Sequence, residues 1–131
     1  MGLDLVSFLV HDYDPAIAFF VDALGFSLAE DTPSVDAKGN EKRWVVVRPP
    51  GPSAGLLLTE ARGAAQLRLV GRQFSDWVGL FLSVDDFDAA HARMVRCNVR
   101  FLERPRVEPY GKVAVFEDLV GNRWDLLEPR R

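Results

Sequence analysis

The chain has 131 residues, of which 48% are hydrophobic and 27% are charged, and its formal net charge is −3. This length and composition predict one folded domain and argue against any long disordered region. Acidic and basic residues alternate instead of clustering, which argues against a nucleic-acid-binding face, and no apolar run is long enough to span a bilayer. The single cysteine, Cys97, excludes an intramolecular disulfide and suits a reducing compartment, so we expect a cytoplasmic protein.

The first half of the chain predicts a strand, a helix and three more strands. The opening strand runs to Val10, and the helix follows with Asp14 as its expected N-cap, Pro15 in its first turn and Gly25 as its stop. Turn-forming residues then separate the remaining strands. These strands are expected at residues 26–30, 43–48 and 55–59.

The second half predicts the same order again. A strand over residues 77–84 leads through Asp85 and Asp86 into a helix that ends at Cys97, which we expect to be buried on its packed face. Strands at 99–102, 113–117 and 123–127 follow, and the last two flank a Gly121-Asn122 turn, so they predict a β-hairpin.

The two halves also match in their letters. Val10-His11-Asp12 before the first helix corresponds to Val84-Asp85-Asp86 before the second, 74 residues later by residue number. A repeat of this length indicates a duplicated βαβββ module. We therefore expect one α+β domain over residues 1–131, with modules at about 1–61 and 76–131. Residues 62–75, rich in Gly, Gln and Arg, are expected to form a linker or a loop at the edge of a ligand site.

The closing segment Phe116-Glu117-Asp118-x-x-Gly121-Asn122-x-Trp124-Asp125-Leu126, together with the two modules, resembles the vicinal oxygen chelate superfamily. This superfamily includes glyoxalase I, the bleomycin-resistance proteins and the extradiol dioxygenases. The resemblance implies two U-shaped mixed sheets around a cavity, with the helices on the convex face, and it implies a homodimer. Strand alternation would then turn Val6, Phe8 and Val10 toward the helices and Asp125 toward the cavity.

Metal-dependent members of this superfamily carry His, Gln or Glu at one cavity-facing position on each of four strands. The corresponding positions are Leu5, Leu57, Gly79 and Asp125, or Glu60 in place of Leu57 if the register is shifted. Only Asp125 is clearly competent, and one carboxylate does not hold a divalent transition metal against water. We therefore predict no metal and no other cofactor, with a divalent transition metal as the alternative.

Without a metal, the cavity would be a small-molecule site with few polar groups. Asp125 is the candidate catalytic residue, and it needs either a partner such as Arg123 or a ligand, because a cavity-facing carboxylate is costly to leave unpaired. Residues 103–111 join two strands and are expected at the cavity mouth. The candidate ligand-binding residues are Trp44, Trp77, Phe81, Glu108, Tyr110, Arg123 and Asp125.

Three functions remain open at this point. The first is metal-independent binding of a small apolar or aromatic compound, by sequestration or conversion. The second is a lyase, isomerase or dioxygenase that uses an unrecognised ligand set or Asp125 as a general base. The third is a module that serves only dimerisation or partner binding. Neither His11 nor His91 has a nucleophile at a recognisable spacing, so no hydrolase triad is predicted.

Overall fold

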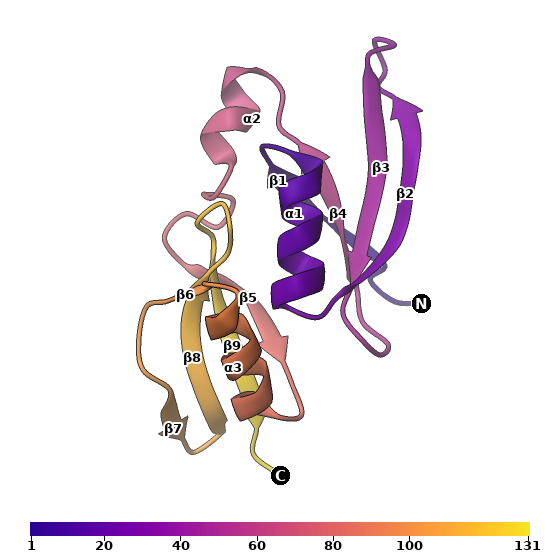
Figure 1. Ribbon diagram of the computed structural model, residues 1–131. Helices are drawn as coiled ribbons and strands as arrows, with labels where there is room; N and C mark the ends of the chain where they lie inside the picture. The colour runs from indigo at the N-terminus through magenta and orange to yellow at the C-terminus, as the bar shows by residue number, and fades with distance from the viewer. The chain divides into compact units, whose positions relative to one another are not determined.

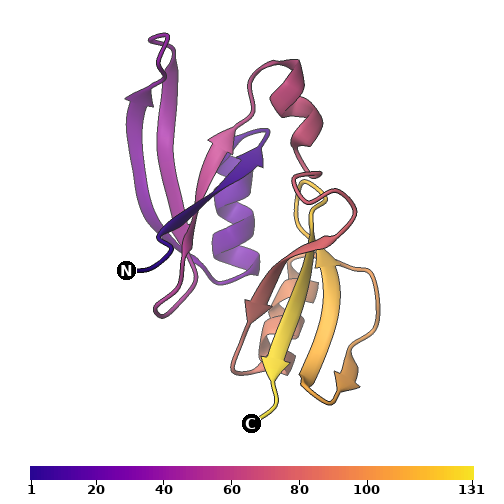
Figure 2. The same cartoon turned by 180° about the vertical axis from the view of Figure 1, so that it is seen from behind.

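The computed structural model describes all residues, 1–131, and divides the chain into two compact units, Met1–Val70 and Gly71–Arg131. Each unit has one β-sheet with a helix packed on one face (Figures 1 and 2). This arrangement confirms the predicted α+β fold and the duplicated module. None of the helices is long and apolar enough to cross a membrane.

Unit 1 has a four-stranded sheet in the order β1-β4-β3-β2. Strand β1 pairs parallel with β4, and the other neighbours are antiparallel. The helix α1 continues into a π-helical turn, η1, and Gly25 with a φ of 76° then ends the helical segment, as predicted. The elements are β1 Leu5–Val10, α1 Tyr13–Ala18, η1 Phe19–Ala23, β2 Ser27–Val35, β3 Glu41–Arg48, β4 Gly55–Glu60 and α2 Gly63–Leu69.

The core of unit 1 lies between the sheet and the α1–η1 segment. Phe8 on β1 is buried and packs edge-on against Phe20 of η1, with 5.3 Å between ring centroids. Val10 is also buried, on the same side of the strand. The predicted orientation of β1 is therefore confirmed, and Leu5, Ser7 and Leu9 lie on the opposite face.

The start of α1 differs from the prediction. The helix begins at Tyr13, so the N-cap is Asp12 and its side chain makes no capping hydrogen bond. Asp14 instead accepts from Nη1 of Arg43 on β3 at 2.9 Å. The predicted capping residue therefore forms an ion pair with a residue far away in the chain. The sequence around Asp14 gives no information about that partner.

Unit 2 has a five-stranded sheet in which β5-β9-β8-β6 follow one another and β7 pairs with the free stretch of β8. Strands β5 and β9 are parallel, and β8 and β9 form the predicted hairpin. The short strand β7 lies in the segment expected as a loop. The elements are β5 Val78–Ser83, α3 Phe87–Arg96, β6 Arg100–Phe101, β7 Arg106–Glu108, β8 Gly111–Glu117 and β9 Arg123–Pro129.

Side chains on one face of the β8–β9 hairpin hold α3 in place. Asp86 caps the helix by accepting from the Ala89 N–H at 3.0 Å, and Glu128 of β9 accepts from the Phe87 N–H at 2.8 Å. Lys112 of β8 forms an ion pair with Asp88 at 2.6 Å. The helix therefore covers the face of the sheet that carries residues 112, 114, 116, 124, 126 and 128.

The turn between β8 and β9 is built on the buried carboxylate of Asp118. Its Oδ1 accepts from three backbone N–H groups, those of residues 120–122, at 3.0, 3.0 and 3.1 Å. Its Oδ2 accepts from the indole N–H of Trp124 at 2.8 Å. The predicted Gly121-Asn122 turn is thus a five-residue loop held by one side chain, and Gly121 has a φ of 104°.

The end of α3 and the segment between the two sheets also differ from the prediction. The prediction that Cys97 is buried is wrong: the residue is exposed, because it is the C-cap of α3 and lies past the last buried residue of the helix, Met94. Within the expected linker, residues 63–69 form the exposed helix α2, and the Gln66 side chain accepts from the Arg62 N–H at 2.8 Å. This bond satisfies one of the N–H groups that a helix start leaves unpaired.

Candidate functional site

The candidate site lies on the face of the unit 2 sheet that α3 does not cover, which we call the open face. Alternation along β9 places Asp125 and Leu127 on this face, because Trp124 and Leu126 point to the helix side. Asp125 stands between Phe81 of β5 and Val115 of β8 in the strand register. On the two adjacent strands Asp125 therefore has apolar neighbours, in agreement with the alternation along β9.

The Asp125 carboxylate makes no hydrogen bond or ion pair in the structure, and its Oδ1 is fully buried. Buried polar atoms are almost always hydrogen-bonded, since an unsatisfied one costs about 1–3 kcal/mol. Phe81 beside it is 66% exposed. The open face thus combines an unsatisfied carboxylate with an accessible aromatic ring.

A second group of polar side chains lies on the same sheet around Arg106 of β7. Arg106 Nε donates to both carboxylate oxygens of Glu103, at 3.0 and 3.2 Å, and Nη1 donates to Glu108 at 3.0 Å and to the Tyr110 hydroxyl at 3.4 Å. Glu103 also accepts from the Val115 N–H at 2.8 Å. These bonds fix Glu103 against β8, the strand next to Asp125.

The two neighbouring carboxyl groups have pKa values shifted in opposite directions. Burial raises the pKa of Asp125, an effect that the positive charge of Arg106 opposes and the negative charge of Glu103 adds to. Burial also acts on Glu103, but the hydrogen bonds from Arg106 and Val115 and the charge of Arg106 outweigh it and lower the pKa of Glu103. Two acids with divergent pKa values on one face are typical of functional sites.

The remaining predicted residues divide between the units. In unit 2, Arg123 does not pair with Asp125; its Nη1 donates to the backbone oxygen of Asp76 at 3.0 Å, next to Trp77, which is 74% exposed. Trp44 belongs to β3 of unit 1, on the side of the sheet opposite Arg43 and the helix, and it is partly exposed. The structure therefore brings Phe81, Glu108, Tyr110 and Asp125 onto one sheet with Arg106, and it places Trp44 in the other unit.

Glu103 and Arg106 are not among the residues that the sequence predicts for the site. Both lie in the segment expected at the cavity mouth, from which the sequence predicts only Glu108 and Tyr110. The sequence signal for them is the Glu-x-x-Arg-x-Glu spacing from residue 103 to residue 108, which alternates charge along a short segment.

Of the positions that the family resemblance implies for metal ligands, only Asp125 carries a donor side chain on the expected face. Leu5 and Leu57 are apolar, and Gly79 lies under Phe74, because a Cβ at this position would come within 2.0 Å of the ring. Glu60 is two positions along from Leu58 and so shares its helix-facing side of β4, opposite Leu57. No three His, Cys, Asp or Glu side chains in the chain are grouped so that they could hold a metal ion.

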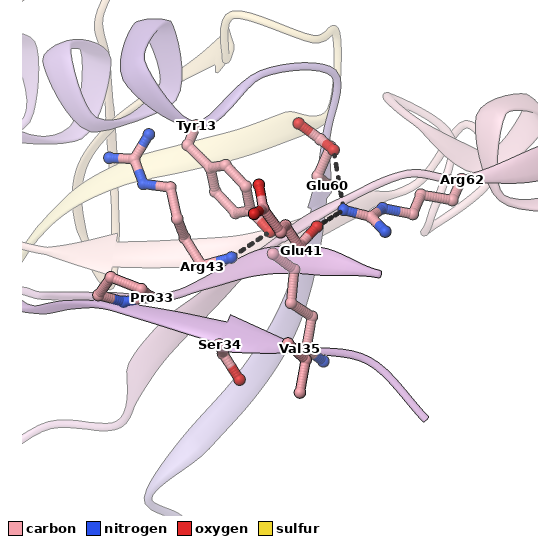
Figure 3. Close-up of a pocket in the computed structure, with 9 residues that line it drawn as sticks. Tyr13, Pro33, Ser34, Val35, Glu41, Arg43, Glu60 and Arg62 are labelled. Carbon is pink, nitrogen blue, oxygen red and sulfur yellow. Dashed lines mark hydrogen bonds and ion pairs between the residues drawn. The ribbon is translucent and has the colours of Figure 1, made fainter. Parts of the chain in front are cut away.

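Unit 1 has a recess of about 880 Å³ at the start of α1 and the end of β4 (Figure 3). Arg62 forms an ion pair with Glu60 at 3.5 Å and donates to the backbone oxygen of Glu41, and the Tyr13 hydroxyl accepts from the Arg43 N–H at 3.4 Å. Both of its arginines are thus engaged, because Arg43 also forms ion pairs with Asp14 and Asp31 outside the recess. The recess contains none of the predicted catalytic or ligand-binding residues, and unlike the open face it leaves no buried carboxylate oxygen unsatisfied.

Known proteins resemble this chain over nearly its whole length. A protein of Shewanella frigidimarina of unassigned function is 45% identical, and the alignment covers 94% of this chain and 90% of that protein. The YurT protein of Bacillus subtilis is 28% identical, and the alignment covers 93% of this chain and 94% of YurT. The crystal structure of TnmS3, an antibiotic-binding protein from a Streptomyces species, is 30% identical with a TM-score of 0.76, covering 99% of this chain and 97% of TnmS3. The family model of the Glyoxalase/Bleomycin resistance protein/Dioxygenase superfamily matches residues 2–126. The chain therefore belongs to this superfamily.

Proposed function

We propose that this protein binds a small apolar or aromatic compound on the open face of unit 2 without a metal ion, and so sequesters or converts it. The single observation that carries the proposal is the unsatisfied Asp125 carboxylate beside the exposed ring of Phe81. Small-molecule sites combine apolar surface with a few polar groups that fix the orientation of the ligand.

The similarity to TnmS3 supports the same proposal. TnmS3 is an antibiotic-binding protein, and it shares 30% of its residues and almost its full length with this chain. The donor set also supports binding without a metal, because three of the four positions that would supply ligands carry Leu, Leu and Gly. Small-molecule binding by a carboxylate and an aromatic ring needs neither a metal nor a second cofactor.

A thermal-shift screen of chelator-treated protein against aromatic compounds, antibiotics included, tests this function. A ligand present at 100 times its dissociation constant stabilises the folded state by about 2.7 kcal/mol. Phe81→Ala is expected to weaken the stabilisation by any hit. Val107→Ala is the matched control, since Val107 is also exposed in unit 2 but points to the opposite side of β7 from Arg106. A screen in which no aromatic compound stabilises the protein would contradict the proposal.

A second candidate function is an enzyme in which Asp125 acts as a general base. The observation in its favour is the raised pKa of Asp125, the direction in which catalytic carboxylates are tuned. Turnover of the methylglyoxal–glutathione adduct or of catechols, lost in Asp125→Asn, would support an enzyme. Absence of turnover with and without added Ni²⁺, Zn²⁺ and Fe²⁺ would favour binding alone.

We also propose a cytoplasmic homodimer. The single cysteine supports a reducing compartment. Trp77 and Phe81 are large apolar side chains that are mostly exposed, a feature common at protein–protein or ligand contacts. A protein that serves only dimerisation would gain no stability in the ligand screen, so the same experiment separates that reading from the proposed function.

A further inference from the structure

The open face of unit 2 is short of positive charge. Three carboxylates, those of Glu103, Glu108 and Asp125, lie around one guanidinium, that of Arg106. Arg106 directs its hydrogen bonds to Glu103, Glu108 and Tyr110, and none to Asp125. The cation of the cluster is therefore already used by the other two acids.

The next candidate cation is also engaged elsewhere. Arg123 lies two residues before Asp125 on the same strand, but its side chain donates to the backbone oxygen of Asp76 at 3.0 Å. On β5, the strand on the other side of Asp125, the paired residue is Phe81, which offers no donor. The chain thus supplies Asp125 with no hydrogen-bond donor in unit 2.

A ligand group that pairs with Asp125 must be a hydrogen-bond donor, because an ionised carboxylate only accepts hydrogen bonds. A positively charged donor suits it best, since charge-assisted bonds are about twice as strong as neutral ones and the surrounding acids favour a cation. The exposed ring of Phe81 beside the carboxylate offers a surface for a flat apolar body, and an aromatic face also attracts cations.

We propose that the open face selects aromatic amines, whose ring lies against Phe81 and whose ammonium group donates to Asp125. This inference rests on the proposed function and names the chemical class of its ligand. The ammonium group of the ligand would supply the hydrogen bond that no group of unit 2 donates to Asp125.

Three naphthyl compounds of nearly equal size test the proposal: 1-naphthylmethylamine, 1-naphthylmethanol and 1-naphthoic acid. Titration calorimetry on the chelator-treated full chain at pH 7 is expected to give about tenfold tighter binding for the amine than for the alcohol, and the weakest binding for the acid. Asp125→Asn is expected to remove most of the preference for the amine. Phe81→Ala is expected to weaken the binding of the amine and of the alcohol by similar factors.

Glu30→Gln serves as the matched control, because it removes one negative charge from an exposed position of unit 1 and is expected to leave the preference unchanged. Equal binding of the three compounds, or preference for the acid, overturns the inference and leaves the proposed function standing. The same holds if other aromatics in the screen bind and none of these three does. If no aromatic compound binds at all, the proposed function fails and this inference fails with it.

Discussion

At the scale of single residues, Asp125 is expected to reduce the stability of the protein. Its pKa is raised by burial, so the folded state holds the proton more tightly than the unfolded chain does. The favourable contribution of the protonated form is fully present below the unfolded pKa, and it is lost as the pH rises through the folded pKa. At neutral pH the ionised carboxylate is therefore a cost to folding.

Asp125→Asn is consequently expected to raise the free energy of unfolding at pH 7, by about 1 kcal/mol or less because the amide is still poorly hydrogen-bonded. Urea denaturation at pH 7 and at pH 4 measures the effect, and the gain is expected to shrink at the lower pH. Glu30→Gln, at an exposed position, is the control and is expected to change little. If Asp125→Asn lowered the free energy of unfolding at pH 7, this would contradict the conclusion that the ionised Asp125 carboxylate destabilises the fold.

Replacement of Asp118 is expected to have the opposite effect, although burial raises the pKa of Asp118 as it does that of Asp125. The difference is that the Asp118 carboxylate accepts hydrogen bonds from three backbone N–H groups and from the Trp124 indole, and these bonds define the β8–β9 loop. Asp118→Asn keeps one acceptor but turns an amide NH₂ toward the indole N–H of Trp124, so we expect a loss of about 2–3 kcal/mol. Chemical denaturation measures it. The control Asp88→Asn removes an ion pair to Lys112 and is expected to cost less than about 1 kcal/mol.

At the scale of elements, the packing of Phe74 on β5 explains the glycine at position 79. A side chain there would occupy the space of the ring, since an added Cβ would lie 2.0 Å from Phe74 Cγ. Gly79→Ala is expected to destabilise the fold by about 1–3 kcal/mol through overpacking. The double variant with Phe74→Ala is expected to show less than the sum of the two single losses, because it removes the clash. Additive losses would show that Phe74 does not rest on Gly79.

Also at this scale, the short strand β7 determines the position of Arg106 in unit 2. Its pairing with β8 brings Arg106 opposite Val113, and from there Arg106 reaches Glu103 and Glu108. The element therefore determines which acid on the open face receives a cation and which does not.

At the scale of the whole molecule, the absence of a competent ligand set predicts that the purified protein carries no stoichiometric transition metal. Elemental analysis of protein prepared without chelator measures this. Near-stoichiometric metal that is lost in Asp125→Ala would contradict the proposed metal-independent function. Phe81→Ala, which leaves every carboxylate in place, controls for indirect effects of disturbing the open face.

The proposed homodimer is a second prediction at this scale. Light scattering coupled to size exclusion is expected to give about twice the chain mass of 14.7 kDa. Trp77→Ser is expected to weaken the dimer, because Trp77 is 74% exposed in the single chain and large exposed aromatic side chains are enriched at interfaces. A monomer at all concentrations would contradict the prediction.

The sequence by itself determined the order of elements apart from α2 and β7, the duplication, the superfamily and the side of the sheet on which Asp125 lies. These features depend on local rules: alternation along a strand, turn chemistry at Gly121-Asn122, and the stop at Gly25. Only the tertiary structure determined which side chains contact one another. Arg106 pairs with Glu103 and Glu108, Arg123 turns to Asp76, and Phe74 covers Gly79. Pairing between side chains depends on which strands and loops meet in space, and that information is not contained in the spacing of residues along the chain.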